Sequence, residues 1–213
     1  MSEESGEHWP GEQLVEAEVE AEEEVEVRED DTGEEPAVVD EPEQLTGHAP
    51  GALDIPDGLD VVEGSPQGTH KRIAIVLSRF NGDVTNRLLE SALAELDRAG
   101  IEREHVTVMP VPGAFELPLG AMALAKTRRY VAIVALGCVI RGETAHFEYV
   151  SGEAASGLQL AALETGVPVA FGVLTTNTLE QAMARADKGA EAVRTALEMA
   201  DLFSQLRATA KAS

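Results

Sequence analysis

Short apolar runs alternate with amphipathic segments along the last two-thirds of the chain. The runs are rich in Val and Ile and too short for typical helices, so they predict buried strands. Strands are expected over 73–78 and 106–111, within YVAIVALGCVI and in VPVAFGVL. Apolar residues recur at helical spacing between and after them, which predicts helices over 83–99, 116–126, 144–164, 178–186 and 188–206. The alternation predicts a three-layer α/β fold of the flavodoxin-like type, a four-stranded parallel sheet with helices on both faces.

Three residues support these helix boundaries. Gly100 follows the first helix where a left-handed C-terminal cap is common. Pro118 is tolerated in the first turn of the second helix, where a missing N–H costs little. Thr144 is expected to cap the third helix through its hydroxyl.

The loops that leave the strands differ in chemistry from the loops that enter them. Entering turns such as KTRR and ETG contain no obvious ligand-binding pattern. The leaving loops SRFNGD, VPGAFELP, IRGETAHF and LTTNT carry glycines and polar side chains. Ligands of open parallel sheets bind beyond the carboxyl ends of the strands, so these four loops predict one binding site on one edge.

The loop from Arg141 to His146 leaves a strand and opens a helix, which favours anion binding at free backbone N–H groups. His146 falls in the first helical turn and could give or take a proton near neutral pH. By itself, the Thr144–His146 pair is better read as a cap and a surface histidine. Its position beside three other polar loops favours a site.

Other candidates also have plain structural explanations. Glu116 either accepts hydrogen bonds from ligand hydroxyls or simply favours the dipole of the helix it begins. Phe80 is either a stacking platform for a flat heterocycle or a contact at the sheet edge. Cys138 is expected to pack as a small apolar residue rather than to act as a nucleophile.

Charge divides the chain into two parts. Residues 1–70 contain 23 acidic residues and one basic residue, Arg28, whereas the remainder carries 16 acidic and 15 basic residues. Dense like charge with few large apolar residues predicts that 1–65 form a disordered acidic extension and 66–213 the folded domain. Such an extension suits solubility, spacing or a basic partner, and argues against nucleic-acid binding.

Cysteine usage and hydropathy indicate the compartment. The chain has a single cysteine, an acidic N-terminus without a signal-peptide pattern, and apolar runs too short for a membrane span. We therefore expect a cytoplasmic protein that has no membrane partner and no metal site.

Four motifs together resemble one family. RFN, PGAFELP, ALGCVIRGETAHFEYV and FGVLTTNTLEQA follow the four strands in turn, and the segment from Ile73 to Leu206 is similar to 6,7-dimethyl-8-ribityllumazine synthases. The resemblance implies that Phe80 stacks on a pyrimidine, that Glu116 accepts ribityl hydroxyls and that His146 transfers protons. It implies further substrate-binding roles for Ala114, Phe115, Cys138, Val139, Ile140, Glu143, Thr144, Phe171 and Arg185. Asn81, Gly113, Gly142 and Lys188 are additional candidates in the same motifs.

The resemblance also implies an activity and an assembly. Members condense 5-amino-6-(D-ribitylamino)uracil with 3,4-dihydroxy-2-butanone 4-phosphate without a cofactor, and they form pentamers, of which some build 60-subunit shells. Phe171 and Arg185 would enter the site from a neighbouring subunit, and riboflavin synthase or basic cargo is a conceivable partner. A flavin- or lumazine-binding protein without turnover, or a shell-forming scaffold, is the alternative. Two features depart from the family: the acidic extension, and a shorter linker between Arg185 and Lys188.

Overall fold

The computed structural model describes residues 53–68 and 70–212. The chain divides into two compact units, 1–54 and 55–213, and the second contains all the helices and strands described. The acidic extension expected over 1–65 therefore lies mostly outside the described residues. In the part of the chain that is described, no helix is both long and apolar enough to cross a membrane.

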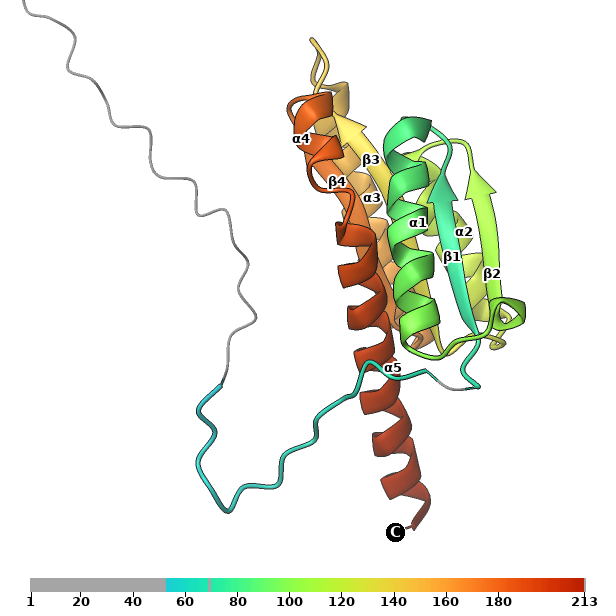
Figure 1. Ribbon diagram of the computed structural model, residues 1–213, viewed down its shortest axis with the longest axis vertical. Helices are drawn as coiled ribbons and strands as arrows, with labels where there is room; N and C mark the ends of the chain where they lie inside the picture. Colours follow the sequence, from blue (N-terminus) through green and yellow to red (C-terminus); the bar gives the residue numbers. More distant parts are fainter. Residues whose placement is uncertain (1–52, 69, 213) are drawn as a thin grey trace, which may run out of the picture. The chain divides into compact units, whose positions relative to one another are not determined.

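Four parallel strands form a single sheet in the order β2-β1-β3-β4 (Figure 1). The strands are β1 (Ile73–Ser78), β2 (Val106–Val111), β3 (Ala132–Ile140) and β4 (Val169–Thr176). The central strands β1 and β3 are buried on both faces, which explains why their sequences are almost continuously apolar. The sequence-based prediction of a four-stranded parallel sheet is confirmed.

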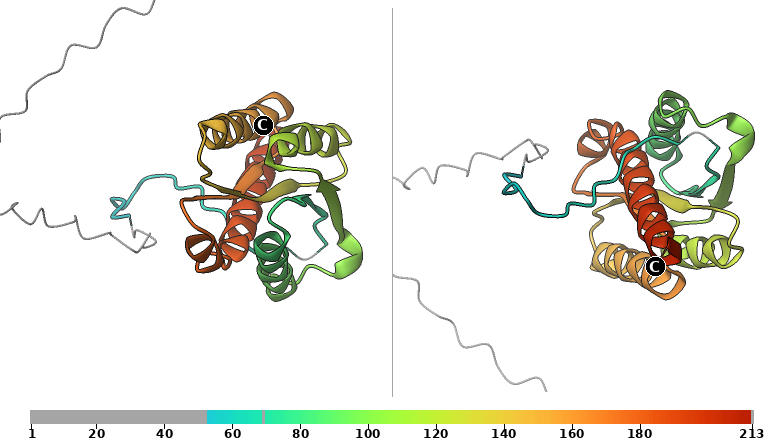
Figure 2. Two further views of the ribbon diagram at one scale, coloured as in Figure 1. Left: turned by 90° about the horizontal axis from the view of Figure 1, so that it is seen from above. Right: turned by 90° about the horizontal axis from the view of Figure 1, so that it is seen from below.

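Helices cover both faces of this sheet. The helical elements are α1 (Gly82–Arg98), η1 (Arg103–His105), η2 (Ala114–Glu116), α2 (Leu117–Lys126), α3 (His146–Thr165), α4 (Leu179–Met183) and α5 (Lys188–Ala212). Helices α1 and α5 pack against one face, and α2 and α3 pack against the other (Figure 2). An apolar core lies on each face of the sheet, and side chains along β1 point alternately to the two faces. Ile73 and Ile75 pack in the core with α1 and α5, whereas Ala74 and Val76 pack in the core with α2 and α3.

Three boundary predictions are wrong. Thr144 does not cap α3, because residues 143–145 form a turn that enters the helix directly through Ala145, and no side chain caps its first turn. Helix α5 continues to Ala212, beyond the predicted end at 206, since residues 207–212 contain no glycine or proline to stop it. Helix α4 is shorter than predicted: Thr178 caps it by accepting from Gln181 N, and the helix ends at Met183.

The segment before β1 contacts α5. Ser65 N donates to Asp201 Oδ2 at 3.1 Å, and Gln205 Nε2 donates to the Glu63 carbonyl at 2.8 Å. A Cβ at Gly64 would lie 2.3 Å from the Glu198 carbonyl oxygen, so only glycine allows this close approach. Residues 63–65 are thus held against the helix just before the expected domain start at 66.

Candidate functional site

The carboxyl end of β3 extends past the end of β1. Pairing between β1 and β3 stops at Leu77 and Leu136, whereas β3 remains paired with β4 as far as Ile140 and Thr176. Along a strand, backbone N–H and C=O groups of alternate residues point to opposite neighbours. Arg141 N donates to the Thr176 carbonyl at 2.8 Å on the β4 side, so Cys138 and Ile140 turn their backbone groups toward the β1 side. The strand tip therefore offers a backbone edge without a strand partner.

A pocket of about 540 Å³ lies at this tip. Its walls come from the loops after β1, β2 and β3 and from the first turns of α3, which are segments far apart in sequence. The pocket gathers twelve of the sixteen predicted site residues: Phe80, Asn81, Gly113, Ala114, Phe115, Glu116, Cys138, Val139, Ile140, Gly142, Thr144 and His146. Of the four polar loops predicted to form one site, the three that follow β1, β2 and β3 line this pocket.

Aromatic side chains stand exposed around the pocket. Phe80 is 70% exposed, Phe115 is 57% exposed and Tyr149 is 71% exposed. The backbone beneath Phe80 is nevertheless fixed, because Arg79 N donates to the Val111 carbonyl and Phe80 N to the Pro112 carbonyl. A phenylalanine on a fixed loop with an uncovered ring is suited to stacking against a flat ligand.

Glu116 ends the short helix η2 and reaches back to its own loop. Its Oε2 accepts from Gly113 N at 2.9 Å, which fixes the carboxylate at the pocket wall. Among the described residues no other group hydrogen-bonds this carboxylate, so Oε1 is available to a ligand donor such as a hydroxyl.

His146 is the first residue of α3 and lines the same pocket from the opposite loop. The backbone N–H groups of this helix end lack partners inside the helix, and the dipole adds partial positive charge there. The adjoining residues 143–145 form a turn whose residues are exposed. An imidazole and an anion-attracting backbone therefore lie together at one end of the pocket.

Arg141 stabilises this region from outside the pocket. Its Nε donates to Asn177 Oδ1 at 3.2 Å, its Nη1 pairs with Glu148 Oε1 at 3.3 Å, and its guanidinium lies 4.6 Å from the centre of the Phe147 ring. These contacts connect the loop after β4 with the first turn of α3. The β4 loop thus supports the site indirectly, which differs from the prediction that it would line it.

Cys138 is 2% exposed, and burial raises the pKa of its thiol to about 11. The thiol is therefore protonated near neutral pH and is a poor nucleophile. This supports the expectation that Cys138 packs as a small apolar residue while its backbone contributes to the strand tip.

Four predicted residues do not line the pocket within one chain: Glu143, Phe171, Arg185 and Lys188. Phe171 is 48% exposed on β4, where it borders a separate groove of about 360 Å³ together with residues of α3 and α5. Arg185 lies between α4 and α5 and donates to the Gln181 carbonyl at 3.0 Å, and Lys188 pairs with Glu191. Glu143 is exposed in the turn before α3.

Sequence reasoning missed three residues of the pocket wall. Phe147, Tyr149 and Val150 all line the pocket, and Phe147 and Val150 also pack against the core beside α2 and α3. Residues three and four positions apart share a helix face, so Tyr149 and Val150 follow from His146 by spacing alone. This helical spacing from His146 could have identified Tyr149 and Val150 as pocket residues from the sequence.

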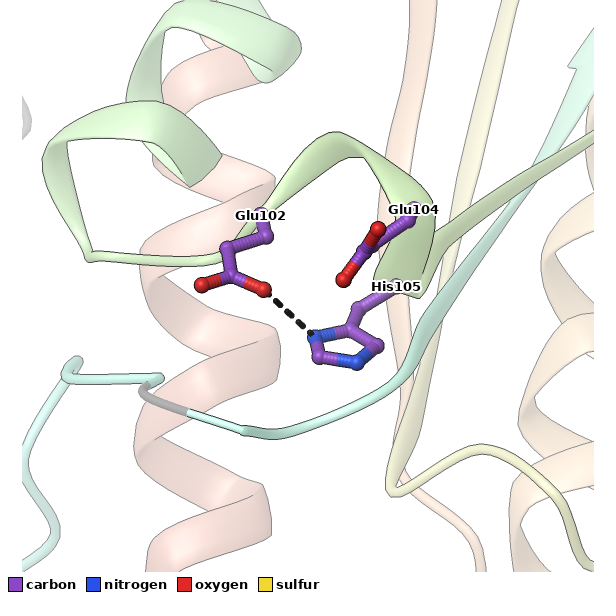
Figure 3. Close-up of side chains that lie close together, drawn as sticks. All are labelled: Glu102, Glu104 and His105. Carbon is purple, nitrogen blue, oxygen red and sulfur yellow. Dashed lines mark ion pairs between the residues drawn. The ribbon is translucent and has the colours of Figure 1, made fainter.

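A second group of titratable residues lies at the other end of the sheet. Glu102, Glu104 and His105 come from the segment that enters β2, and their ligand-type atoms lie within 4.8 Å of one another (Figure 3). His105 Nδ1 is 3.9 Å from Glu102 Oε2. Because this group precedes β2 whereas the pocket follows the strands, it is no part of the pocket.

Comparisons with known proteins agree with this geometry. A family model described as 6,7-dimethyl-8-ribityllumazine synthase matches residues 70–204. Two curated proteins of that name, from Yersinia pestis (strain Pestoides F) and Yersinia pseudotuberculosis serotype O:1b (strain IP 31758), are each 50% identical over 155 residues. Each match covers 70% of this chain and 99% of the relative. The chain therefore belongs to the 6,7-dimethyl-8-ribityllumazine synthase family.

Proposed function

We propose that this protein is a transferase that condenses 5-amino-6-(D-ribitylamino)uracil with 3,4-dihydroxy-2-butanone 4-phosphate. The product is 6,7-dimethyl-8-ribityllumazine, formed in the penultimate step of riboflavin biosynthesis. The observation that carries the proposal is the convergence of Phe80, Glu116 and His146 on one pocket at the carboxyl edge of the sheet. Membership of the family supports the same reaction.

The pyrimidine substrate fits the part of the pocket between β1 and β3. The Phe80 ring would stack on the heterocycle, and backbone groups at the tip of β3 that face the β1 side, such as those of Ile140, would hydrogen-bond its polar edge. Ala114 and Phe115 would flank the ribityl chain, with Glu116 accepting from its hydroxyls. The hydrogen bond from Gly113 N to Glu116 Oε2 supports this role, since it fixes the acceptor before the ligand binds.

The sugar phosphate fits the opposite end. Residues 142–144 and the first turn of α3 would bind the phosphate through backbone N–H groups, with Glu143 and Thr144 shaping the turn. Arg185 would add a bidentate guanidinium contact from a second copy of the chain, with Lys188 beside it. Its position away from the pocket within one chain supports that arrangement.

The reaction needs orientation and proton transfer rather than oxidation or reduction. The pyrimidine amine attacks the ketone carbon, and loss of water gives an imine. Phosphate then leaves, and ring closure releases a second water. His146 would move protons between these groups, because its imidazole lies in the pocket and its ring nitrogens can donate or accept a proton.

An assembly of at least five copies would complete the site. Phe171 and Arg185 lie outside the pocket of their own chain, and the apolar groove beside Phe171 borders the edge strand β4. Covering such an edge is a common reason for oligomerisation. We propose a cytoplasmic homopentamer or larger assembly in which 66–213 form the catalytic domain and 1–65 an appendage. Solution mass measurement would separate pentamer, decamer and 60-mer.

An assay with both substrates tests the reaction. Formation of the lumazine, followed by its absorbance, is the expected result. Binding of ribitylaminouracil without product formation would favour a ligand-binding protein of the same fold and contradict the proposal.

A further inference from the structure

Asn81 has an unusual conformation at the start of α1. Its backbone is left-handed, with φ 59° and ψ 48°, and it occupies the N-cap position of the helix. An asparagine there normally accepts a hydrogen bond from an N–H of the first turn through its side-chain oxygen, which stabilises a helix by roughly 1 kcal/mol. Here the side chain makes no such bond. Its amide therefore serves something other than the helix.

The Asn81 side chain instead reaches across to β3. Its Nδ2 donates to the Cys138 carbonyl oxygen at 2.9 Å, and both residues line the pocket. Cys138 lies two residues beyond Leu136, the last residue of β3 that pairs with β1. The side-chain amide of Asn81 thus donates to the Cys138 carbonyl in place of a backbone N–H of β1, because β1 has already ended at this point.

This single bond connects two parts of the pocket wall. On one side it fixes the Cys138 peptide, and hence the strand tip through Ile140. On the other side it fixes the residue that follows Phe80, whose ring is otherwise 70% exposed. The distance between the stacking ring and the backbone edge of β3 therefore depends on Asn81.

We propose that Asn81 is a positioning residue for the pyrimidine, and that it acts through the Cys138 carbonyl and Phe80. This inference rests on the proposed function, because it assigns a role within the same pocket. The residue type fits two requirements at once. Asparagine tolerates a left-handed backbone better than most residues, and its amide supplies the N–H donor that a carbonyl needs.

Two substitutions separate positioning from helix capping. Asn81→Asp keeps the tolerance of the left-handed backbone and an excellent capping group, but its carboxylate cannot donate to the Cys138 carbonyl. Asn81→Gly keeps the backbone conformation and removes the side chain altogether. If Asn81 served only the helix, Asn81→Asp would behave as the wild type does.

Arg128 offers a matched control at the other end of the sheet. It too is a non-glycine residue in the left-handed region, with φ 58°, and its Nη1 donates to the Thr165 carbonyl at 2.6 Å. It follows α2, precedes β3 and does not line the pocket. Arg128→Gly therefore removes a similar side-chain bond without touching the proposed site.

The experiment compares steady-state KM values for the two substrates in the full-length chain. Both Asn81 variants are expected to raise KM for ribitylaminouracil about tenfold while KM for the butanone phosphate changes less than about twofold. Arg128→Gly is expected to lower the melting temperature and to leave both KM values near those of the wild type. The split between substrates matters because loss of folded protein lowers the rate at every substrate concentration and leaves both KM values unchanged.

The possible outcomes distinguish failure of the proposed enzymatic function from failure of the proposed positioning role of Asn81. If the wild type forms no lumazine, the proposed function fails. If the wild type is active and Asn81→Asp has a wild-type KM for ribitylaminouracil, the positioning role alone is wrong. Equal increases in both KM values in either Asn81 variant would also contradict it.

Discussion

The two ends of the parallel sheet carry charged and polar groups in contrasting arrangements. At the amino end, Lys71 pairs with Asp201, Arg103 pairs with Asp97, and Arg128 donates to the Thr165 carbonyl. At the carboxyl end, His146 and one oxygen of Glu116 face a pocket, and neither has a hydrogen-bond partner among the described residues.

This difference shows where the fold can accept a ligand. The pairs named at the amino end satisfy one another. At the carboxyl end, His146 and Glu116 Oε1 remain available to a ligand, as expected where the loops of an open parallel sheet diverge. Substitutions at the carboxyl end should therefore change catalysis, and those at the amino end should change stability.

The largest effect is expected from His146→Ala. Removing the proposed proton-transfer group should lower kcat by at least about a hundredfold, with the melting temperature nearly unchanged because the side chain is exposed. His105→Ala at the amino end is the control and should leave kcat unaltered. A normal kcat for His146→Ala would remove this residue from the mechanism.

Arg185→Ala should chiefly raise KM for the butanone phosphate, by roughly tenfold, because a charge-assisted phosphate contact is lost. Arg207→Ala provides a control, since it removes an exposed arginine near the end of α5. Steady-state kinetics with the phosphate substrate varied would reveal the effect. Unchanged KM in Arg185→Ala would mean that the phosphate is bound without this side chain.

Cys138 should make stability depend on pH on the alkaline side. The pKa of its thiol is raised to about 11, above the value of about 8.5 typical of an unfolded chain. The folded state therefore retains a proton that the unfolded state releases, and stability falls as pH rises from about 8.5 toward 11. Denaturant titrations at pH 7 and pH 10 should show the wild type losing about 2 kcal/mol more than Cys138→Ala. An equal loss in both proteins would contradict this assignment.

Asp201 should make the stability of the fold depend on pH on the acidic side. Hydrogen bonds from Gln205 and from Ser65 N, together with Lys71, hold the pKa of this carboxyl below its usual value. Its contribution is therefore present above the unfolded pKa of about 3.9 and disappears as pH falls through the lowered value. Asp201→Asn should melt a few degrees lower at pH 7, with the gap closing in acid. Thermal melts at both pH values measure this, and a constant gap would count against the ionised carboxylate.

The smallest effect on catalysis is expected from deleting residues 1–52. These residues contain 19 of the chain's 39 acidic residues and one basic residue, and none of them is assigned to the pocket. Retention of kcat and both KM values within about twofold is expected, as for an appendage that does not contribute to a folded core. Loss of activity on truncation would instead place the extension in the site.

Much of the fold was predictable because it depends on patterns that one strand or helix reveals by itself. The continuous apolar runs of β1 and β3 report burial on both faces, and the strand-helix alternation sets the parallel order. Boundaries were less predictable where competing local structures were available. Thr144 has the chemistry of a cap, yet the preceding turn enters α3 through Ala145.

The site was predictable to the extent that its residues follow strands. Phe80, Glu116 and His146 could be assigned to one edge because parallel strands end together. The left-handed backbone of Asn81 and its hydrogen bond to the Cys138 carbonyl could not be predicted from the sequence, since both depend on how the loop after β1 packs against the tip of β3. The roles of Phe171 and Arg185 likewise depend on a second copy of the chain, and they stay predictions.

A crystal structure of the assembled protein with ribitylaminouracil bound would show whether the pocket at the carboxyl edge of the sheet is the substrate site. We expect the heterocycle to stack on Phe80 at the carboxyl edge of the sheet, with the ribityl chain beside Glu116 and the reacting amine toward His146. Density for the ligand anywhere else, with this pocket left open in every subunit, would contradict it.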